Sequence, residues 1–204
     1  MATPRLDITI RNSSQIIDRL KDYRDNCRLI ESRYQYFISE MIMLRLFSVF
    51  EDTVAEIAYK IGAGAQYING TTPNLLYRDN NMAGSRTEML RRGRAKPVQN
   101  LKWTKAKYIR ESVKHVIDIN EKYVQYATIH GNEIDEMRKV RNFLAHRNTG
   151  TRREFREVIR LLYGANLNIS SGAFLVSDRR LPIPNLDRYI TTTKIILNDM
   201  TKGF

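Results

Sequence analysis

The chain has 204 residues, of which 42% are hydrophobic and 27% charged, and this mixture excludes an intrinsically disordered protein. The formal net charge of +12 favours an acidic partner, nucleic acid first, with an anionic membrane surface or an acidic protein as alternatives. The single cysteine excludes an internal disulfide and no apolar run is long enough for a signal peptide or a membrane span, so we expect a cytoplasmic protein without membrane contact.

The N-terminal third is predicted to be mostly helical. Residues 6–10 alternate between apolar and polar types, which indicates a short strand or an extended arm. From Gln15 to about Ile61, apolar residues recur every three or four positions without Pro or Gly, so we expect helix. This length is unusual for one globular helix, and a bend near 31–33 that divides it in two is an alternative that no residue in the segment fixes. Residues 41–50 are apolar on nearly all sides, which is typical of a helix buried centrally or at a subunit interface.

The middle of the chain is the least regular part. Gly62 and Gly64 are expected to end the first helical region, because glycine readily adopts the turn that follows a helix. Scattered Gly, Pro and Asn residues make 65–100 irregular, apart from a short helix around 86–92. Helical spacing resumes and continues over 104–129.

Two helices are predicted between residues 132 and 164. Asn132 with Asp135 has the pattern of a cap for the first, whose apolar face includes Met137, Val140 and Leu144. Thr151 with Glu154 has the capping-box pattern for the second, which is expected to end at Gly164.

The last forty residues are predicted to be a loop followed by one helix. Residues 165–184 contain one candidate strand, 173–177, which could pair with 6–10, and the final helix covers about 186–200. All elements together predict an all-α fold, a bundle of five to six helices with minor short strands.

The segment from Met137 to His146 contains Arg141, then Asn142, then His146 at the end of a predicted helix. It resembles the signature of the HEPN (higher eukaryotes and prokaryotes nucleotide-binding) superfamily, an Arg and a polar residue followed by a His. The apolar helix over 41–58, with Phe50 and Glu51 in sequence, is similar to the core helix of several bacterial HEPN families. The resemblance covers about 14–164 of a single domain, 1–204, and leaves unexplained the basic insertion, 62–103, and the C-terminal extension, 165–204.

The resemblance implies an endoribonuclease that needs no metal or other cofactor, works on RNA as a homodimer with a composite active site, and serves as a toxin or defence effector. A cognate antitoxin is an implied partner. The implied catalytic residues are Arg141, Asn142 and His146. Glu51 is an implied supporting residue that would hold the Arg or the His, with a solvent-facing or salt-bridged glutamate as the alternative.

The chemistry of the three residues fits this reaction. Attack by a ribose 2'-hydroxyl needs a base near neutral pH, and histidine is the side chain whose ordinary pKa suits. Arg141 offers a planar pair of donors for phosphate oxygens, and Asn142, on the same helix face as His146, could orient the imidazole or bind phosphate. In a regular helix, however, Arg141 and His146 lie about 140 degrees apart. Either the helix loosens at His146 or two chains build the site.

The segment 86–110 is strongly basic and contains Trp103 and Tyr108, which predicts an RNA-binding surface of charges and stacking rings. The alternative is a solvated loop with Trp103 in the core. Basic residues beside the motif would extend this surface. The predicted RNA-binding residues are Arg91, Arg92, Arg94, Lys102, Lys105, Lys107, Arg147, Arg152 and Arg153.

The other two histidines and the single cysteine do not indicate a further functional site. His115 and His130 have no partners at metal-ligand spacing, so no metal site is predicted and both are expected to be structural or surface residues. Cys27 is expected to be a small core residue. The main alternative function is a non-catalytic HEPN-like module that binds RNA, a nucleotide or a protein, and a DNA-binding regulator ranks below it.

Overall fold

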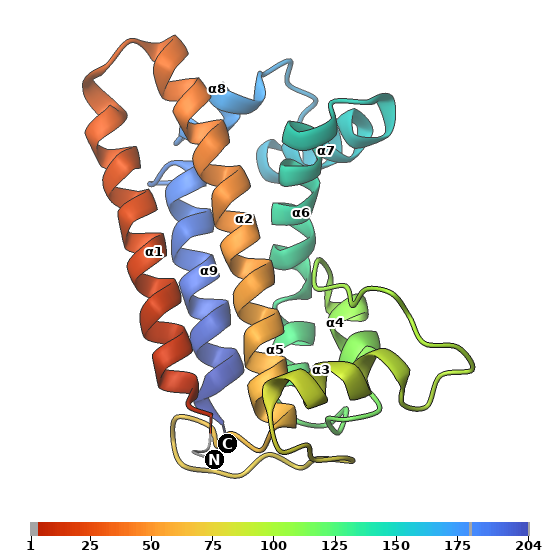
Figure 1. Ribbon diagram of the computed structural model, residues 1–204. Coiled ribbons are helices and arrows are strands. Elements are labelled where there is room, and N and C mark those ends of the chain that lie inside the picture. Colours follow the sequence, from red (N-terminus) through yellow and green to blue (C-terminus); the bar gives the residue numbers. More distant parts are fainter. Residues whose placement is uncertain (1–3, 180, 204) are drawn as a thin grey trace. The chain divides into compact units, whose positions relative to one another are not determined.

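The computed structural model describes residues 4–179 and 181–203, and within them the predicted all-α fold is confirmed (Figure 1). These residues contain no strand, only an isolated bridge between Leu75 and Ile117, and none of their helices combines the length and apolar character needed to cross a bilayer. The helices are α1 (Leu6–Asn26), α2 (Ser32–Gly62), α3 (Met82–Arg91), α4 (Ala106–Val113), α5 (Lys122–Ile129), α6 (Gly131–His146), α7 (Thr149–Tyr163), α8 (Ser171–Val176) and α9 (Asn185–Lys202), with a 3-10 turn, η1 (Cys27–Leu29).

The described residues divide into two compact units that alternate along the chain. Unit 1 contains 4–14, 50–134 and 195–203, and unit 2 contains 15–49, 135–179 and 181–194. Helices α1, α2, α6 and α9 each contribute residues to both units. The motif 141–146 therefore belongs to unit 2, whereas the basic insertion belongs to unit 1.

Helix α1 begins at Leu6, so the strand or extended arm predicted at 6–10 is wrong. The structure buries Leu6 and Thr9 while Ile8 is exposed, which is helical rather than strand spacing. Within unit 1, Lys60 of α2 donates from Nζ to Thr9 Oγ1 at 2.6 Å. No strand lies within the described residues to pair with this segment, so the helical conformation satisfies its backbone groups.

The long helical region is interrupted at 27–31, just before the bend considered near 31–33, so it forms two helices. Helix α1 ends at Asn26, and α2 begins at Ser32 after η1. Ile30 between them is extended, with φ −91° and ψ 168°. Cys27, expected in the core, is half-exposed in this turn instead, because the helix ends before its side chain can join the buried face.

Helix α2 is buried in its middle and exposed at its start. Within 41–50, Leu46 and Phe47 are almost fully buried, as predicted for this segment. Earlier on the helix, Tyr34 is 50% exposed, Phe37 61% and Met41 43%. These three residues, spaced by three and four positions, lie along one face of α2 and are named the α2 stripe below.

In unit 1, α2 ends at Gly62, as predicted, and Gly64 follows with a φ of +84°. Gly62 also allows a close approach of α3. A Cβ atom built there would lie 2.2 Å from the Ser85 hydroxyl oxygen and 3.1 Å from a methyl carbon of Val116. Helix α3 itself confirms the short helix predicted around 86–92.

The single helix predicted at 104–129 is wrong, because residues 114–121 separate α4 from α5. The buried Glu121 stabilises this separation. Its carboxylate accepts hydrogen bonds from the Tyr67 hydroxyl at 2.8 Å and from the backbone N–H of Asn74 at 2.6 Å. Burial, and then this bond to Glu121, raises the pKa of the Tyr67 hydroxyl well above its ordinary value. Helical periodicity alone cannot reveal such a long-range carboxylate contact.

Helix α7 confirms the predicted stop at Gly164, which has a φ of +70°, but its start differs from the prediction. Asn148 is the N-cap, and its side chain accepts from the backbone N–H of Thr151 at 2.9 Å while the Thr151 hydroxyl accepts from the N–H of Asn148. Glu154 has a different role from the predicted capping box. It pairs with Arg138 at 3.2 Å.

The strand predicted at 173–177 is wrong, because α8 covers most of this segment and packs on α2 in unit 2. Gly172 makes the approach possible, since a Cβ atom there would lie 2.3 Å from Cβ and 2.8 Å from Cα of Tyr36. The buried Phe174 accepts at its carbonyl oxygen a 2.8 Å hydrogen bond from Asn185 Nδ2, at the start of α9. The final helix predicted at about 186–200 is confirmed by α9.

Candidate functional site

The motif residues Arg141, Asn142 and His146 lie in the last two turns of α6, where the sequence predicts them. The helix begins at Gly131, so Asn132 is not its cap, contrary to the prediction. Its apolar face is buried as expected at Met137, Val140 and Leu144. Periodicity therefore identifies the buried face correctly even though it misplaces the start of the helix.

Arg138 anchors the motif helix to α7 within unit 2. This buried side chain donates from Nε to Asp135 at 2.9 Å, and its guanidinium lies 3.2 Å from Glu154 on α7. Lys139 pairs with Glu157 of α7 at 2.8 Å. Because a buried guanidinium is stable only with carboxylate partners, the Arg138 contacts hold α7 beside the motif.

Arg141 is half-buried, and its guanidinium carbon lies 5.6 Å from the centre of the Phe47 ring of α2. Its Nη1 donates to Asn142 Oδ1 at 3.1 Å. The ring and the amide together restrict the guanidinium, which is the condition for directional binding of phosphate oxygens. Asn142 is thus coupled to Arg141, and its amide nitrogen remains a donor for a ligand.

His146 is the last residue of α6, and its side chain is exposed. Within the described residues, 4–179 and 181–203, the imidazole forms no hydrogen bond or ion pair. Arg147 follows with a φ of +40°, a left-handed conformation that a non-glycine residue rarely adopts. Its backbone N–H still donates to the Phe143 carbonyl oxygen at 3.0 Å. The strained residue therefore ends the helix directly after the candidate base.

Glu40 of α2 holds this helix end and is a residue that sequence reasoning missed. Its Oε2 accepts a hydrogen bond from Arg147 Nη2 at 2.8 Å, and its Oε1 accepts from the hydroxyl of Ser171 on α8. One carboxylate thus joins α2, α8 and the residue after His146. No local pattern in the sequence marks Glu40, because both partners are more than a hundred residues away.

Replacing Glu40 by glutamine is expected to lower the free energy of unfolding by about 1–2 kcal/mol, since the charge-assisted bonds to Arg147 and Ser171 weaken. Amide hydrogen exchange of residues 146–149 should also become faster. Chemical denaturation and exchange mass spectrometry measure the two effects. Glu31→Gln is the matched control, because its ion pair with Arg33 is exposed, and an equal change in both variants would contradict the positioning role.

The three motif residues do not converge within one chain. Helix α6 remains helical through His146, so the loosening that would bring the imidazole towards Arg141 does not occur. At about 100 degrees per residue the two side chains leave the helix about 140 degrees apart. Arg141 is joined to Asn142, and His146 stands at the helix end. Of the two expectations for the site, the loosened helix is absent, and the composite of two chains stays a prediction.

Glu51 lies on the part of α2 that belongs to unit 1, whereas the motif belongs to unit 2. The side chain is half-buried and is not without a partner. Its role in holding Arg141 or His146 stays a prediction of the resemblance.

The basic insertion is partly neutralised by its own carboxylates. Arg91 and Arg92 both pair with Glu88 of α3, at 2.8 Å in the case of Arg92. The Arg92 guanidinium also stacks 3.5 Å from the centre of the Tyr77 ring. These two arginines therefore hold the α3 region together. Because their guanidinium groups are partly occupied by Glu88 and Tyr77, they are less available to bind phosphate than the sequence suggests.

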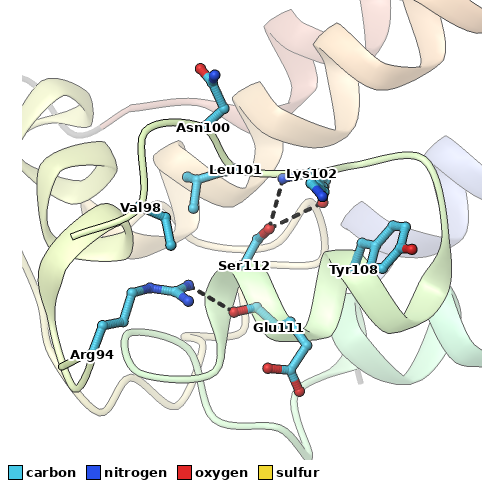
Figure 2. A pocket seen from close by; sticks show the side chains of 8 residues that line it. All are labelled: Arg94, Val98, Asn100, Leu101, Lys102, Tyr108, Glu111 and Ser112. Carbon is cyan, nitrogen blue, oxygen red and sulfur yellow. Dashed lines mark hydrogen bonds between the residues drawn. The ribbon is translucent and has the colours of Figure 1, made fainter. Parts of the chain in front are cut away.

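Arg94 and the neighbouring loop form a small hollow in unit 1 (Figure 2). Arg94 donates to the Met89 carbonyl oxygen at 3.1 Å and to the Glu111 carbonyl oxygen at 2.9 Å. The Ser112 hydroxyl lies between the backbone N–H and the carbonyl oxygen of Lys102, as Figure 2 shows. The hollow has a volume of about 140 Å³. Arg94 thus serves mainly to shape this loop.

The two aromatic residues of the basic segment 86–110 separate into one core residue and one residue near the surface. Trp103 is only 8% exposed and packs edge-on against Tyr59, with the two ring centres 5.7 Å apart. It therefore belongs to the core, as the alternative interpretation expects. Tyr108 is half-exposed beneath the Lys102 ammonium, 5.5 Å from its ring centre. Lys107 is exposed and Lys105 is half-buried, so Tyr108 and its neighbouring lysines lie at or near the surface of unit 1.

The arginines of α7 are more open to ligands than those of the insertion. Arg152, Arg153 and Arg156 are exposed, and none of the three forms an ion pair with the described part of the chain. Arg152 and Arg156 are one turn apart, so they share a face of α7. Helix α7 begins shortly after the motif in the sequence, and both lie in unit 2.

The remaining histidines have structural surroundings. His130 hydrogen-bonds to Asp199 at 2.8 Å, and His115 lies against Gly93, with burial first and nearby cations second lowering its pKa. Among residues 4–179 and 181–203, no group of three or more His, Cys, Asp or Glu side chains is arranged to hold a metal ion.

Comparisons with known proteins identify no relative of this chain: no family model, no curated protein and no solved structure matches it.

Proposed function

We propose that this protein is a metal-independent endoribonuclease of the HEPN type, in which Arg141, Asn142 and His146 cut RNA at a site built from two copies of the chain. One observation carries the proposal. A restrained guanidinium, hydrogen-bonded to Asn142, lies on the same helix as an exposed imidazole that forms no hydrogen bond or ion pair with the described residues. This combination supplies a phosphate ligand and a base without using the core of the protein.

The proposed reaction is an intramolecular transfer on the RNA. His146 of one copy removes the proton of a ribose 2'-hydroxyl, and the 2'-oxygen forms a bond to the adjacent phosphorus. The bond from phosphorus to the 5'-oxygen breaks, and His146 of the other copy donates a proton to that oxygen. The products are a 2',3'-cyclic phosphate and a 5'-hydroxyl. Arg141 and Asn142 bind the phosphate oxygens while negative charge develops on them.

The α2 stripe supports a second copy as the missing half of the site. Tyr34, Phe37 and Met41 form an exposed apolar face, which is unfavourable in water and typical of an interaction surface. Glu40, between Phe37 and Met41, contacts Arg147 directly after His146. A partner copy that covers the stripe would therefore lie next to the helix end that carries the candidate base, which is where Arg141 of that copy is needed.

A role as a toxin or defence effector, held in check by a cognate antitoxin, is part of the same proposal. The exposed arginines of α7 and the net charge of +12 suit an acidic inhibitor as well as RNA. An antitoxin that covers His146 would block both the base and the entry of RNA.

Incubation of the purified protein with labelled single-stranded RNA in the presence of EDTA tests the proposal. We expect cleavage to continue in EDTA and mass spectrometry to find 2',3'-cyclic phosphate and 5'-hydroxyl ends. Loss of cleavage in EDTA, or cleavage that is undiminished in His146→Ala, would contradict this mechanism. RNA binding without any cleavage by the wild type would favour the non-catalytic module instead.

A further inference from the structure

Unit 2 contains a second hollow, distinct from the one in the basic insertion and lying beside the motif helix. Its volume is about 260 Å³. It is bordered by the end of α6, one face of α7 and the segment before α8, and we name it the α7 hollow. Its lining residues are Phe143, Arg147, Arg152, Phe155, Arg156, Ile159 and 167–171.

We propose that the α7 hollow is a nucleotide subsite, which binds the base and a phosphate of the RNA residue next to the bond that is cut. This inference rests on the proposed function for the position of the cut. The binding of a nucleotide unit itself follows from the shape, the aromatic surface and the charges of the hollow.

The apolar part of the hollow suits a planar ring. Phe143 and Phe155 are stacked almost parallel, with ring centres 4.7 Å apart and an angle of 7° between the planes. Phe155 and Ile159 are buried, while Phe143 is half-exposed at the edge of the space. A cavity of about 150 Å³ accepts one benzene ring, so 260 Å³ leaves room for a base with part of its sugar.

The rim of the hollow suits a phosphate. Arg152 and Arg156 contribute two guanidinium groups that form no ion pair with the described residues, and Arg147 contributes a third, paired with Glu40. None of the lining residues is acidic. An apolar floor below uncompensated cations matches an aromatic base attached to a phosphate, and the Asn168 amide adds a donor and an acceptor for the edge of a base.

The position of the hollow along α6 connects it to the cut. Phe143 precedes His146 by three residues, which places the two side chains on neighbouring parts of the helix surface. Arg147 follows His146 directly, and Glu40 restrains it. A nucleotide with its base against Phe143 and its phosphate at Arg152 and Arg156 would therefore extend along the helix end that carries the candidate base.

Binding of a 2'-O-methyl oligonucleotide, which cannot be cut because it has no 2'-hydroxyl, tests the subsite separately from catalysis. Fluorescence anisotropy over a range of salt concentrations should show that Arg152→Ala/Arg156→Ala binds at least about tenfold more weakly. The slope of log K against log salt should fall by about 0.7, since the two arginines bind one phosphate and each phosphate contact on a single strand contributes about 0.7. Phe143→Leu, which keeps an apolar side chain, should weaken binding about fivefold or more.

Arg19→Ala/Arg179→Ala is the matched control, because it removes two exposed arginines of unit 2 that lie outside α7 and do not line the hollow. We expect it to bind within about twofold of the wild type. Equal affinities of the two double variants, or binding of inorganic phosphate as tight as that of the oligonucleotide, would overturn the subsite. If the Arg152/Arg156 variant loses binding but the wild type cuts no RNA, the subsite stands and the proposed function fails. If the wild type cuts RNA and the Arg152/Arg156 variant retains its KM, the subsite fails alone.

Discussion

Arg141→Ala and His146→Ala are each expected to reduce RNA cleavage at least about a hundredfold, and to abolish growth arrest when the protein is expressed in cells. A donor aimed at developing charge and a general base each contribute about this much or more. Arg141→Lys is expected to recover little activity, because an ammonium cannot replace the planar guanidinium that is hydrogen-bonded to Asn142. Initial rates on a labelled RNA, together with colony counts after induction, measure these effects.

The control for these variants is Arg19→Ala, which removes one exposed charge of unit 2 away from the motif. It should keep full activity. Thermal unfolding of all variants separates a catalytic defect from a folding defect, and we expect His146→Ala to unfold like the wild type because its side chain is exposed and unbonded to the described residues. Wild-type rates in both Arg141→Ala and His146→Ala would remove these residues from the mechanism.

Phe37→Glu is expected to turn a dimer into a monomer and to reduce RNA cleavage at least about a hundredfold. Phe37 is the most exposed residue of the α2 stripe, and a charge at the centre of a buried apolar interface is strongly unfavourable. Since Arg141 and His146 of one chain diverge, a monomer should lack a complete site. Analytical ultracentrifugation and the RNA cleavage assay are to be run at the same protein concentrations.

Leu161→Glu is the matched control for the stripe. Leu161 lies on α7 in the same unit and is 70% exposed, more than Phe37, yet it is outside the α2 stripe. We expect this variant to remain dimeric and active. A monomeric wild type that cuts RNA at full rate, or a Phe37→Glu variant that does so, would show that one chain suffices and that the composite site is wrong.

Local signals in the sequence predicted much of the secondary structure. The turn at Gly62 and Gly64 and the stop at Gly164 depend on residues that act within a few positions, so they can be identified directly. The predictions failed where a distant residue decides. Glu121 divides the expected 104–129 helix because Tyr67 and Asn74 bind its carboxylate.

The sequence was misleading at both places where it indicated a strand. Residues 6–10 and 173–177 are each too short to distinguish a two-residue from a three-to-four-residue period, and the tertiary structure decides for helix in both. Gly172 illustrates the reason, since the close contact with Tyr36 of α2 requires a helix that presents a bare backbone at that position.

The same distinction between local and long-range contacts applies to the candidate site. The residue types and spacing of Arg141, Asn142 and His146, and their place at the end of a helix, follow from the sequence, because they lie within six consecutive residues. Tertiary structure alone places Phe47 against Arg141, joins Glu40 to Arg147 and forms the α7 hollow, since these contacts join segments that are far apart along the chain. It also leaves Tyr34, Phe37 and Met41 exposed, which periodicity cannot distinguish from a buried face. The sequence thus determined which groups could do the chemistry, and packing decided which of them are held, which are free, and which surface a second copy could cover.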